Sequence, residues 1–181
     1  VFKKHQLSIY DIEELSTHGG SLRLYLKHSE NSSLPILRSV QDIVDTEVKY
    51  GIDKFDYYQK FVKRVSKNKL DILEFLVKQN KDGKKIAAYG AAAKGNTFLN
   101  YCGIKNDLID FVVDASPIKQ NKLLPGSHIP VVSEEVLRIE KPDYVLIFPW
   151  NIRDEISIQI SYIKDWGGKF VVAIPYLEVL Q

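Results

Sequence analysis

Residues 85–100 read KIAAYGAAAKGNTFLN, and this stretch decides the fold. The segment Ile86–Tyr89 is short, apolar and preceded by lysines, a pattern typical of a buried parallel strand. One glycine and three alanines follow, and Asn96 or Thr97 is predicted to cap a helix that continues to about Tyr101. The stretch therefore predicts a strand, a turn of small residues and a helix in direct succession.

The turn between this strand and this helix has the composition of an anion site. Backbone N–H groups point outward at a helix N-terminus, the helix dipole favours negative charge, and small side chains let a phosphate approach. Lys94 adds a positive charge at the same place. We expect Gly90, Lys94, Gly95 and Asn96 to bind a phosphate group. The stretch alone leaves open a turn that only packs a helix close to a strand.

Two familiar phosphate loops differ from this turn. The nucleoside-triphosphate loop needs a lysine where this chain has Asn96, because an ammonium must reach the outer phosphates. The dinucleotide fingerprint needs a central glycine where this chain has Ala92, because the backbone must approach a pyrophosphate closely. The turn therefore excludes an ATPase and disfavours a tight NAD site.

Composition bounds the class of protein. The chain has 181 residues, is 45% hydrophobic and carries a formal net charge of +2, which suits one α/β domain with an appendage and argues against a nucleic-acid partner. A single cysteine, Cys102, excludes a disulfide framework and a cysteine metal cluster, so we expect a packed thiol and no metal site. Without an apolar run of membrane-spanning length, we expect a soluble, cytoplasmic protein with no membrane partner. The absence of methionine, at position 1 as elsewhere, indicates a piece of a longer protein.

From residue 85 onward, buried strands alternate with helical segments. Strands are predicted at 86–89, 108–114, 131–132, 143–148 and 169–174, and further helices at 133–140 and 154–166. This order predicts an α/β fold, a Rossmann-like doubly wound parallel sheet with helices on both faces. Ligands of such sheets bind at the carboxyl ends of the strands. The residues expected there are Gly90, Asp114, Trp150 and Pro175.

The part of the chain before this sheet is predicted to begin with a β-hairpin. Residues 7–15 alternate loosely and residues 21–27 alternate strictly, with a Gly-Gly turn between them. A polar linker follows at 29–33, then a helix from Pro35 to Gly51 and a long amphipathic helix at 55–80 whose apolar stripe is assigned to the core. We therefore divide the chain into a hairpin arm and linker, 1–34, and a Rossmann-like domain, 35–181.

Four residues near the strand ends are candidates for ligand binding. Asp114 ends a strand where an acid commonly holds sugar hydroxyls, or it caps the next turn. Lys119 can reach a phosphate, or it is a solvated lysine. Trp150 and Asn151 can stack on a base and hydrogen-bond to it, or they are a core tryptophan and a helix cap.

The Gly-Gly turn of the hairpin carries the candidate for proton transfer. His18 precedes Gly19 and Gly20, and histidine is the usual general base near neutral pH. The two glycines permit close approach of a substrate, and Arg23 follows shortly after. An inert turn histidine is the alternative.

Six stretches together resemble the C-terminal domain of sugar-nucleotide C-methyltransferases. They keep that family's order and span most of the chain. They are Thr17–Arg23, Tyr89–Thr97, Val113–Asp114 with Lys119–Gln120, Pro125–Pro130, Lys141–Tyr144, and Pro149–Asn151 with Glu155. The chain departs from the family at Thr17, where some members carry an acid, and in residues 121–124, which lack a glycine expected there.

The resemblance implies an activity for the full-length protein. Family members use S-adenosylmethionine to methylate a carbon of a dTDP-linked 4-keto-deoxysugar, and their chains place a zinc-binding region and a methyltransferase domain before a Rossmann-like domain. It implies that this domain binds the nucleotide-sugar and completes the active-site cleft, and that the missing domain binds most of the cofactor. These residues alone are then expected to be inactive. The residues expected to bind substrate are Gly19, Gly20, Gly90, Lys94, Gly95, Asn96, Asp114, Lys119, Trp150 and Asn151.

The implied chemistry agrees with the residues of the hairpin turn. A carbon beside a ketone becomes nucleophilic when a base removes its proton, and His18, which matches the family's base, fits that role. The enolate oxygen then needs a donor, for which Arg23 or the N–H groups of Gly19 and Gly20 are candidates. Two other functions stay open, an NAD-binding redox domain and a non-catalytic nucleotide-sugar module.

Overall fold

The computed structural model describes residues 1–180, apart from the side chain of His18. The chain divides into two compact units, Val1–Lys63 and Arg64 onward, and each is described by itself. The long helix α2, Phe55–Lys81, runs through the division. The functional boundary that we expect between residues 34 and 35 stays a prediction.

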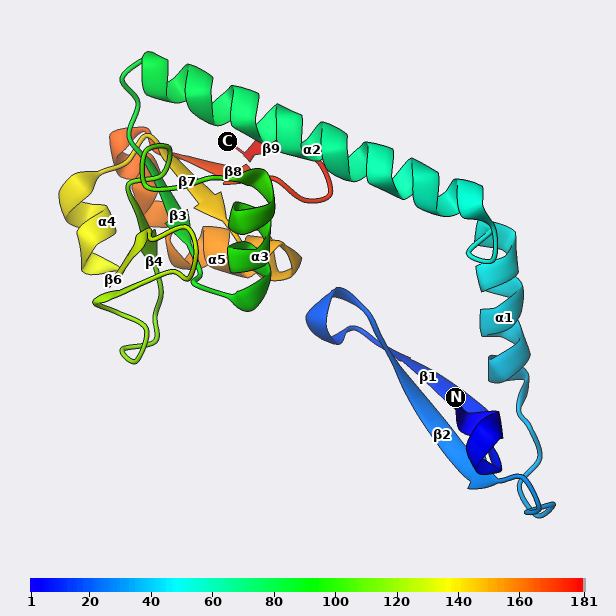
Figure 1. The fold of residues 1–181 in the computed structure, drawn as a ribbon. Coiled ribbons are helices and arrows are strands. Elements are labelled where there is room, and N and C mark those ends of the chain that lie inside the picture. The colour runs from blue at the N-terminus through cyan, green and yellow to red at the C-terminus, as the bar shows by residue number, and fades with distance from the viewer. Residues whose placement is uncertain (181) are drawn as a thin grey trace. The chain divides into compact units, whose positions relative to one another are not determined.

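The second unit is built on a mostly parallel sheet (Figure 1). Among the described residues its seven strands are β3 (Ile86–Tyr89), β4 (Phe111–Val113), β5 (Lys122–Leu123), β6 (Pro130–Val132), β7 (Tyr144–Ile147), β8 (Lys169–Val172) and β9 (Glu178–Leu180). They lie in the order β5-β6-β4-β3-β7-β8-β9. The five inner strands are parallel, while β5 and β9 pair antiparallel at the two edges. The α/β class is therefore confirmed.

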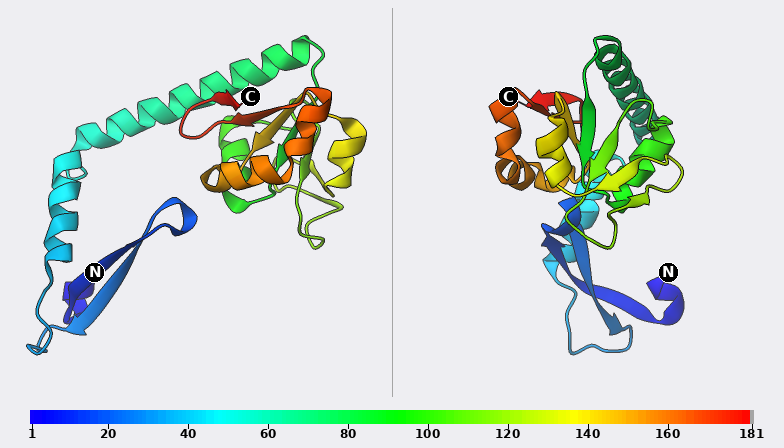
Figure 2. Two further views of the ribbon diagram at one scale, coloured as in Figure 1. Left: turned by 180° about the vertical axis from the view of Figure 1, so that it is seen from behind. Right: turned by 90° about the vertical axis from the view of Figure 1, so that its left-hand side faces the viewer.

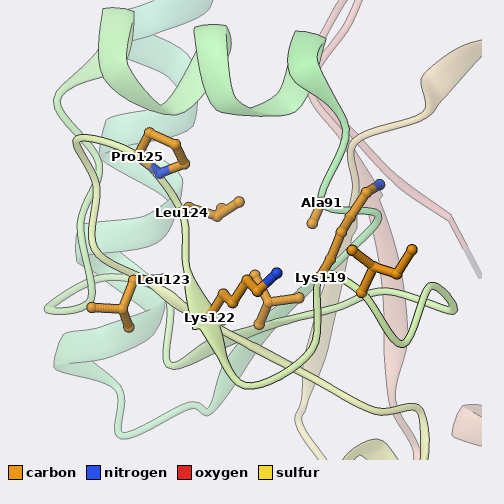
Figure 3. Close-up of a pocket in the computed structure, with 8 residues that line it drawn as sticks. Ala91, Lys119, Lys122, Leu123, Leu124 and Pro125 are labelled. Carbon is orange, nitrogen blue, oxygen red and sulfur yellow. The ribbon is translucent and has the colours of Figure 1, made fainter.

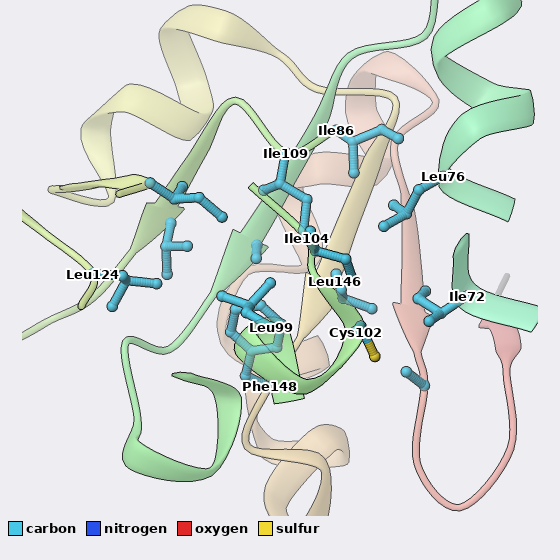
Figure 4. Packing of buried hydrophobic residues seen from close by; sticks show 14 of the residues in the cluster. Ile72, Leu76, Ile86, Leu99, Cys102, Ile104, Ile109, Leu124, Leu146 and Phe148 are labelled. Carbon is cyan, nitrogen blue, oxygen red and sulfur yellow. The ribbon is translucent and has the colours of Figure 1, made fainter. Parts of the chain in front are cut away.

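Helices cover both faces of this sheet (Figure 2). They are the second half of α2 and α3 (Ala93–Cys102) on one face, and α4 (Glu135–Glu140), α5 (Arg153–Gln159) and the 3-10 helix η4 (Ser161–Trp166) on the other. Side chains of a strand alternate between faces, so Ile86 and Ala88 of β3 join the first cluster and Ala87 joins the second. Figure 4 shows Ile72 of α2 among the first cluster. The sheet is thus buried on both sides, as its continuous apolar strands predict.

The first unit confirms the predicted hairpin. Strands β1 (Leu7–Leu15) and β2 (Ser21–His28) pair antiparallel, with a bulge between Ile9 and Asp11. A short 3-10 helix, η2 (Thr17–Gly19), forms the turn, and another, η1 (Phe2–His5), precedes β1. Helix α1 (Arg38–Tyr50) begins three residues later than predicted and ends at Gly51, which adopts the left-handed conformation.

The predicted start of α3 is wrong. The helix begins at Ala93, with Ala92 at the N-cap position, and not at Asn96 or Thr97. Alanine has the highest helix propensity, so Ala93, the last of the three alanines, is already helical. Thr97 accordingly donates its hydroxyl to the carbonyl of Ala93 at 3.1 Å, inside the helix.

The predicted core stripe of the long helix is also wrong over its first half, and at Leu70 and Val77 in its second half, which are exposed. Phe55 and Val62 are exposed, as are Tyr58 and Phe61, and this half of the helix belongs to the first unit. Within the described chain, the fully buried side chains of α2 are Ile72 and Leu76.

Two further departures concern the end of the chain and the sheet edges. The helix predicted at 154–166 is interrupted at Ile160, where α5 gives way to η4. Edge strands β5 and β9 are absent from the sequence prediction, because two or three residues are too few to show an alternation.

Candidate functional site

The predicted glycine turn lies where two neighbouring strands end. Strands β3 and β7 pair in parallel, so Gly90 after β3 and Pro149 after β7 meet at the same edge of the sheet. Gly90 has φ of 93°, and a Cβ built on it would lie 2.6 Å from the ring of Pro149. A Cβ on Gly95 would lie 2.7 Å from the side chain of Phe148. The two glycines therefore let the turn and α3 pack directly against the segment that follows β7.

This packing brings three of the predicted site residues together. The ammonium of Lys94, in the first turn of α3, lies 4.9 Å from the ring centroid of Trp150 and donates a hydrogen bond to Oδ1 of Asn151. Trp150 and Asn151 belong to the 3-10 helix η3 (Trp150–Ile152). Since the first N–H groups of a helix lack partners within it, this edge combines helix N–H donors, a cation and an aromatic ring.

Asp114 lies on the other side of the turn and holds it in place. One carboxylate oxygen, Oδ2, accepts from the backbone N–H of Ala91 at 2.8 Å and from the ammonium of Lys119 at 3.0 Å. The other oxygen accepts from the N–H of Ser116 at 2.9 Å. The side chain of Asp114 is only 11% exposed. In this structure Asp114 therefore clamps the turn that follows β3 to the loop that follows β4.

A pocket of about 260 Å³ opens beside this clamp (Figure 3). Its wall combines lysine and apolar side chains, among them Ala91, Ile118, Lys119, Lys122, Leu123 and Pro125. Of these, Lys119 is a predicted site residue. Ala91, Ile118 and Leu123 were not predicted, and Leu123 belongs to the short strand β5, which leaves no periodic signal in the sequence.

Asn96 lies away from the surface of the turn. Its Oδ1 atom is buried and has no hydrogen-bond partner among the described residues. Its carbonyl accepts from the side chain of Asn100 at 2.8 Å, and that same side chain also donates to the carbonyl of Pro125. The side chain of Asn100 thus ties α3 to the loop at Pro125, and the role of Asn96 toward phosphate stays a prediction.

The hairpin turn belongs to the first unit. The side chain of His18 lies outside the described residues, so its predicted role stays a prediction. The N–H of Gly20 donates to the carbonyl of Thr17 at 3.0 Å, within the turn. Gly19 and Gly20 have φ of 87° and 117°, which a side chain would strain.

Arg23 is paired across the hairpin with Glu13. Its guanidinium lies 2.9 Å from Oε2 of Glu13, which also accepts from the hydroxyl of Tyr25 at 2.8 Å. Hydrogen bonding with Tyr25 is the largest influence on the pKa of Arg23 and the negative charge of Glu13 is the second, and both raise it above its ordinary value. Because both partners of the ion pair are about half exposed, the pair itself contributes little to stability.

Among the described residues, no group of three or more His, Cys, Asp or Glu side chains could hold a metal ion. In the same part of the chain, none of the helices has both the length and the apolar character to cross a membrane. Cys102 is buried, and burial raises the pKa of its thiol to about 11, which confirms the packed thiol.

Two comparisons with known proteins identify the family of this chain. The chain is similar to the C-methyltransferase NovU of Streptomyces niveus, with 32% identity over 181 residues, which is 100% of this chain and 43% of that protein. The chain thus spans less than half the length of this relative. A family profile described as C-methyltransferase C-terminal domain matches residues 16–175, from the hairpin turn to the end of the parallel strands. This chain therefore belongs to the C-methyltransferase C-terminal domain family.

Proposed function

We propose that these residues are the substrate-binding part of a methyltransferase that uses S-adenosylmethionine to C-methylate a nucleotide-linked keto-deoxysugar. The observation that supports it is the contact of Lys94 with Trp150 and Asn151 at the N-terminus of α3. It lies at the carboxyl ends of β3 and β7, where the strand order reverses. Such reversal points bind ligands in doubly wound sheets, so we assign the sheet to the Rossmann-like class.

The ligand fits this edge through its diphosphate. The first-turn N–H groups of α3 and the ammonium of Lys94 favour a doubly charged group, and no side chain larger than a methyl group stands in the turn before Lys94. The ring of Trp150 offers a face on which a nucleobase can stack. We propose a dTDP-sugar, the substrate class implied by the family resemblance.

We propose that neither S-adenosylmethionine nor NAD binds at this edge. Both ligands carry a ribose whose hydroxyls are held by a free acid after the second strand of such a fold. Here Asp114 occupies that place, and its carboxylate already accepts two backbone N–H groups and the ammonium of Lys119. We therefore assign the methyl donor to the part of the full-length protein outside these residues, and we disfavour the NAD-binding alternative.

Proton removal is assigned to the hairpin turn. We propose that His18 takes the proton from the carbon beside the sugar ketone, so that the electron pair of the C–H bond moves into the enolate. The enolate oxygen then accepts from Arg23 or from the N–H of Gly19, since the N–H of Gly20 is engaged with Thr17. The nucleophilic carbon that results is what a methyl transfer requires. A cytoplasmic location stays a prediction.

Ligand binding tests this proposal. Thermal-shift and calorimetric titrations of the protein with dTDP, NAD and S-adenosylmethionine separate the candidates. We expect dTDP to raise the melting temperature and NAD to leave it unchanged. Stabilisation by NAD and none by dTDP would replace the proposed function with the redox alternative.

A further inference from the structure

The hairpin of the first unit presents its apolar face to solvent. Ile12 pairs with Leu24 and Ile9 pairs with Leu26, and directly paired residues of an antiparallel sheet share a face. Leu22, two residues before Leu24, lies on this face too, and these three leucines are 48%, 36% and 37% exposed in order along the chain. We call Ile9, Ile12, Leu22, Leu24 and Leu26 the leucine face.

The side chains of the opposite, polar face make hydrogen bonds within the chain. Arg23 and Tyr25 each donate a hydrogen bond to Glu13, and the centroid of the Tyr25 ring lies 6.2 Å from that of the Tyr10 ring. The ammonium of Lys27 donates to the carbonyls of Asn31 and Leu34, in the segment that leads to α1. The polar side chains of the hairpin therefore have partners within the chain, while the leucines of the other face stay exposed, although a half-buried sheet normally buries its apolar face.

Helix α1 does not close the leucine face. It is attached to β1 through the N–H of Leu37, which donates to the carbonyl of Tyr10 at 2.8 Å, and through Ser39, whose hydroxyl donates to Asp11 at 2.6 Å. The leucines remain exposed with α1 in place. A two-stranded sheet without an apolar cover is only marginally stable, and clustered exposed apolar side chains mark an interaction surface.

We propose that the leucine face docks the part of the full-length protein that lies outside residues 1–181. The match covers 43% of the relative from Streptomyces niveus. More than half of that relative therefore lies outside the matched region, and a family member has that further chain as a partner for this face. An intramolecular partner is always present at high effective concentration, which suits a face this small. A stable dimer buries a larger area than five side chains provide. Ser21 and Leu22 directly follow the turn. Docking of the leucine face therefore places the turn that carries His18 beside that part of the protein.

Photo-cross-linking of the full-length protein tests this docking. Leu24 is replaced by p-benzoylphenylalanine, and the cross-linked peptides are identified by mass spectrometry. We expect cross-links within one chain to peptides outside residues 1–181. Cross-links to residues 64–181, cross-links to a second copy, or none at all would overturn the proposal. The matched control is the same replacement at Ile158, which is 76% exposed on α5 and is expected to give no such cross-link.

A second measurement leaves the protein unaltered. Under hydroxyl-radical footprinting of the full-length protein, the peptide with Leu22, Leu24 and Leu26 is expected to be oxidised more slowly than the peptide with Ile158. Equal oxidation would contradict docking. The inference rests on membership of the family and not on the proposed ligand. A failure here would leave nucleotide binding by the second unit intact, and the titrations above report on that separately.

Discussion

Lys94 is held from two sides, unlike an ordinary surface lysine. Its ammonium faces the ring of Trp150 and bonds to Asn151, while its backbone lies in the first turn of α3. A charge fixed at a helix N-terminus pre-organises the site for an anion, because little conformational freedom is lost when the anion binds.

Replacing this lysine tests its role toward the nucleotide. Lys94→Ala is expected to weaken dTDP binding by about 1 to 3 kcal/mol, the scale of a lost hydrogen bond to a charged group. Calorimetry of the variant measures this change. Lys69→Ala is the matched control, because Lys69 also lies over a ring, that of Tyr101 at 5.3 Å, away from the sheet edge. Equal affinity of wild type and Lys94→Ala would make Lys94 a purely structural residue.

The proton-transfer role of His18 has its own test in the full-length enzyme. His18→Ala is expected to cut turnover by roughly 10²- to 10⁴-fold, the usual contribution of a positioned general base, with nearly unchanged affinity for the nucleotide-sugar. Loss of deuterium from a substrate labelled at the reacting carbon measures the step directly.

The control for that experiment lies in the same hairpin. His28→Ala removes a histidine from the end of β2, and this variant is expected to release deuterium from the labelled substrate at the wild-type rate. If His18→Ala released deuterium at the wild-type rate, the base would be another residue.

At the scale of elements, the turn after β3 depends on the absence of side chains. Gly90 combines a positive φ with a close approach to Pro149, so two separate costs act on a substitution there. Gly103 at the end of α3 also has a positive φ, of 77°, but a Cβ there would meet no atom within 4 Å among the described residues.

These two glycines form a matched pair of variants. Gly103→Ala is expected to lower the free energy of unfolding by about 1 kcal/mol, from backbone strain alone. Gly90→Ala is expected to lower it by roughly 1 to 3 kcal/mol more, because Pro149 must also move. Denaturant titration measures both. Equal destabilisation would show that the turn is not packed against the segment after β7.

Asp143 fastens the opposite end of the same strands. Its carboxylate accepts from the backbone N–H of Lys85 at 2.9 Å and from the ammonium of Lys84 at 3.0 Å. Burial alone would raise the pKa of Asp143, but these two donors outweigh it and lower the pKa below its ordinary value. A carboxyl whose pKa is lower in the folded state contributes stability above its unfolded pKa of about 3.9 and loses it as the pH falls through the folded value.

The pH dependence of Asp143→Asn follows from that sign. Because the Asp143 side chain is 38% exposed and solvent screens its ion pair, the variant is expected to be less stable than wild type by at most about 1 kcal/mol at neutral pH, with the difference shrinking in acid below about pH 4. Unfolding curves at several pH values measure it. Asp42→Asn, which removes the exposed Arg38–Asp42 pair, is expected to change stability by only a few tenths of a kcal/mol. A constant difference across pH would contradict the assigned hydrogen bonds.

The elements that the sequence predicts well are those whose pattern is local. The strand Ile86–Tyr89, the hairpin and the long helix carry a clear period or composition, and the structure confirms them. The contact of Lys94 with Trp150 is not predictable in this way, since the two residues become neighbours only because β7 pairs with β3. The clamp formed by Asp114 likewise depends on β4 pairing with β3 from the other side.

At the scale of the whole molecule, the two compact units carry different proposed roles. The first contains the hairpin turn with the proposed base, and the second contains the sheet edge with the proposed nucleotide site. Since the chain spans 43% of its relative from Streptomyces niveus, methyl transfer is expected from the full-length protein and not from residues 1–181 alone. Methylation by residues 1–181 alone, measured with labelled S-adenosylmethionine, would contradict this division of roles.

The central claim is that a nucleotide binds at the edge where β3 and β7 end. Hydrogen–deuterium exchange of the protein with and without dTDP measures this most directly, because it locates the ligand along the chain. The account predicts slower exchange in the peptides that contain the Gly90–Thr97 turn and the Trp150–Ile152 segment, with NAD giving no such protection. Protection confined to other peptides, or the same protection by NAD, would contradict it.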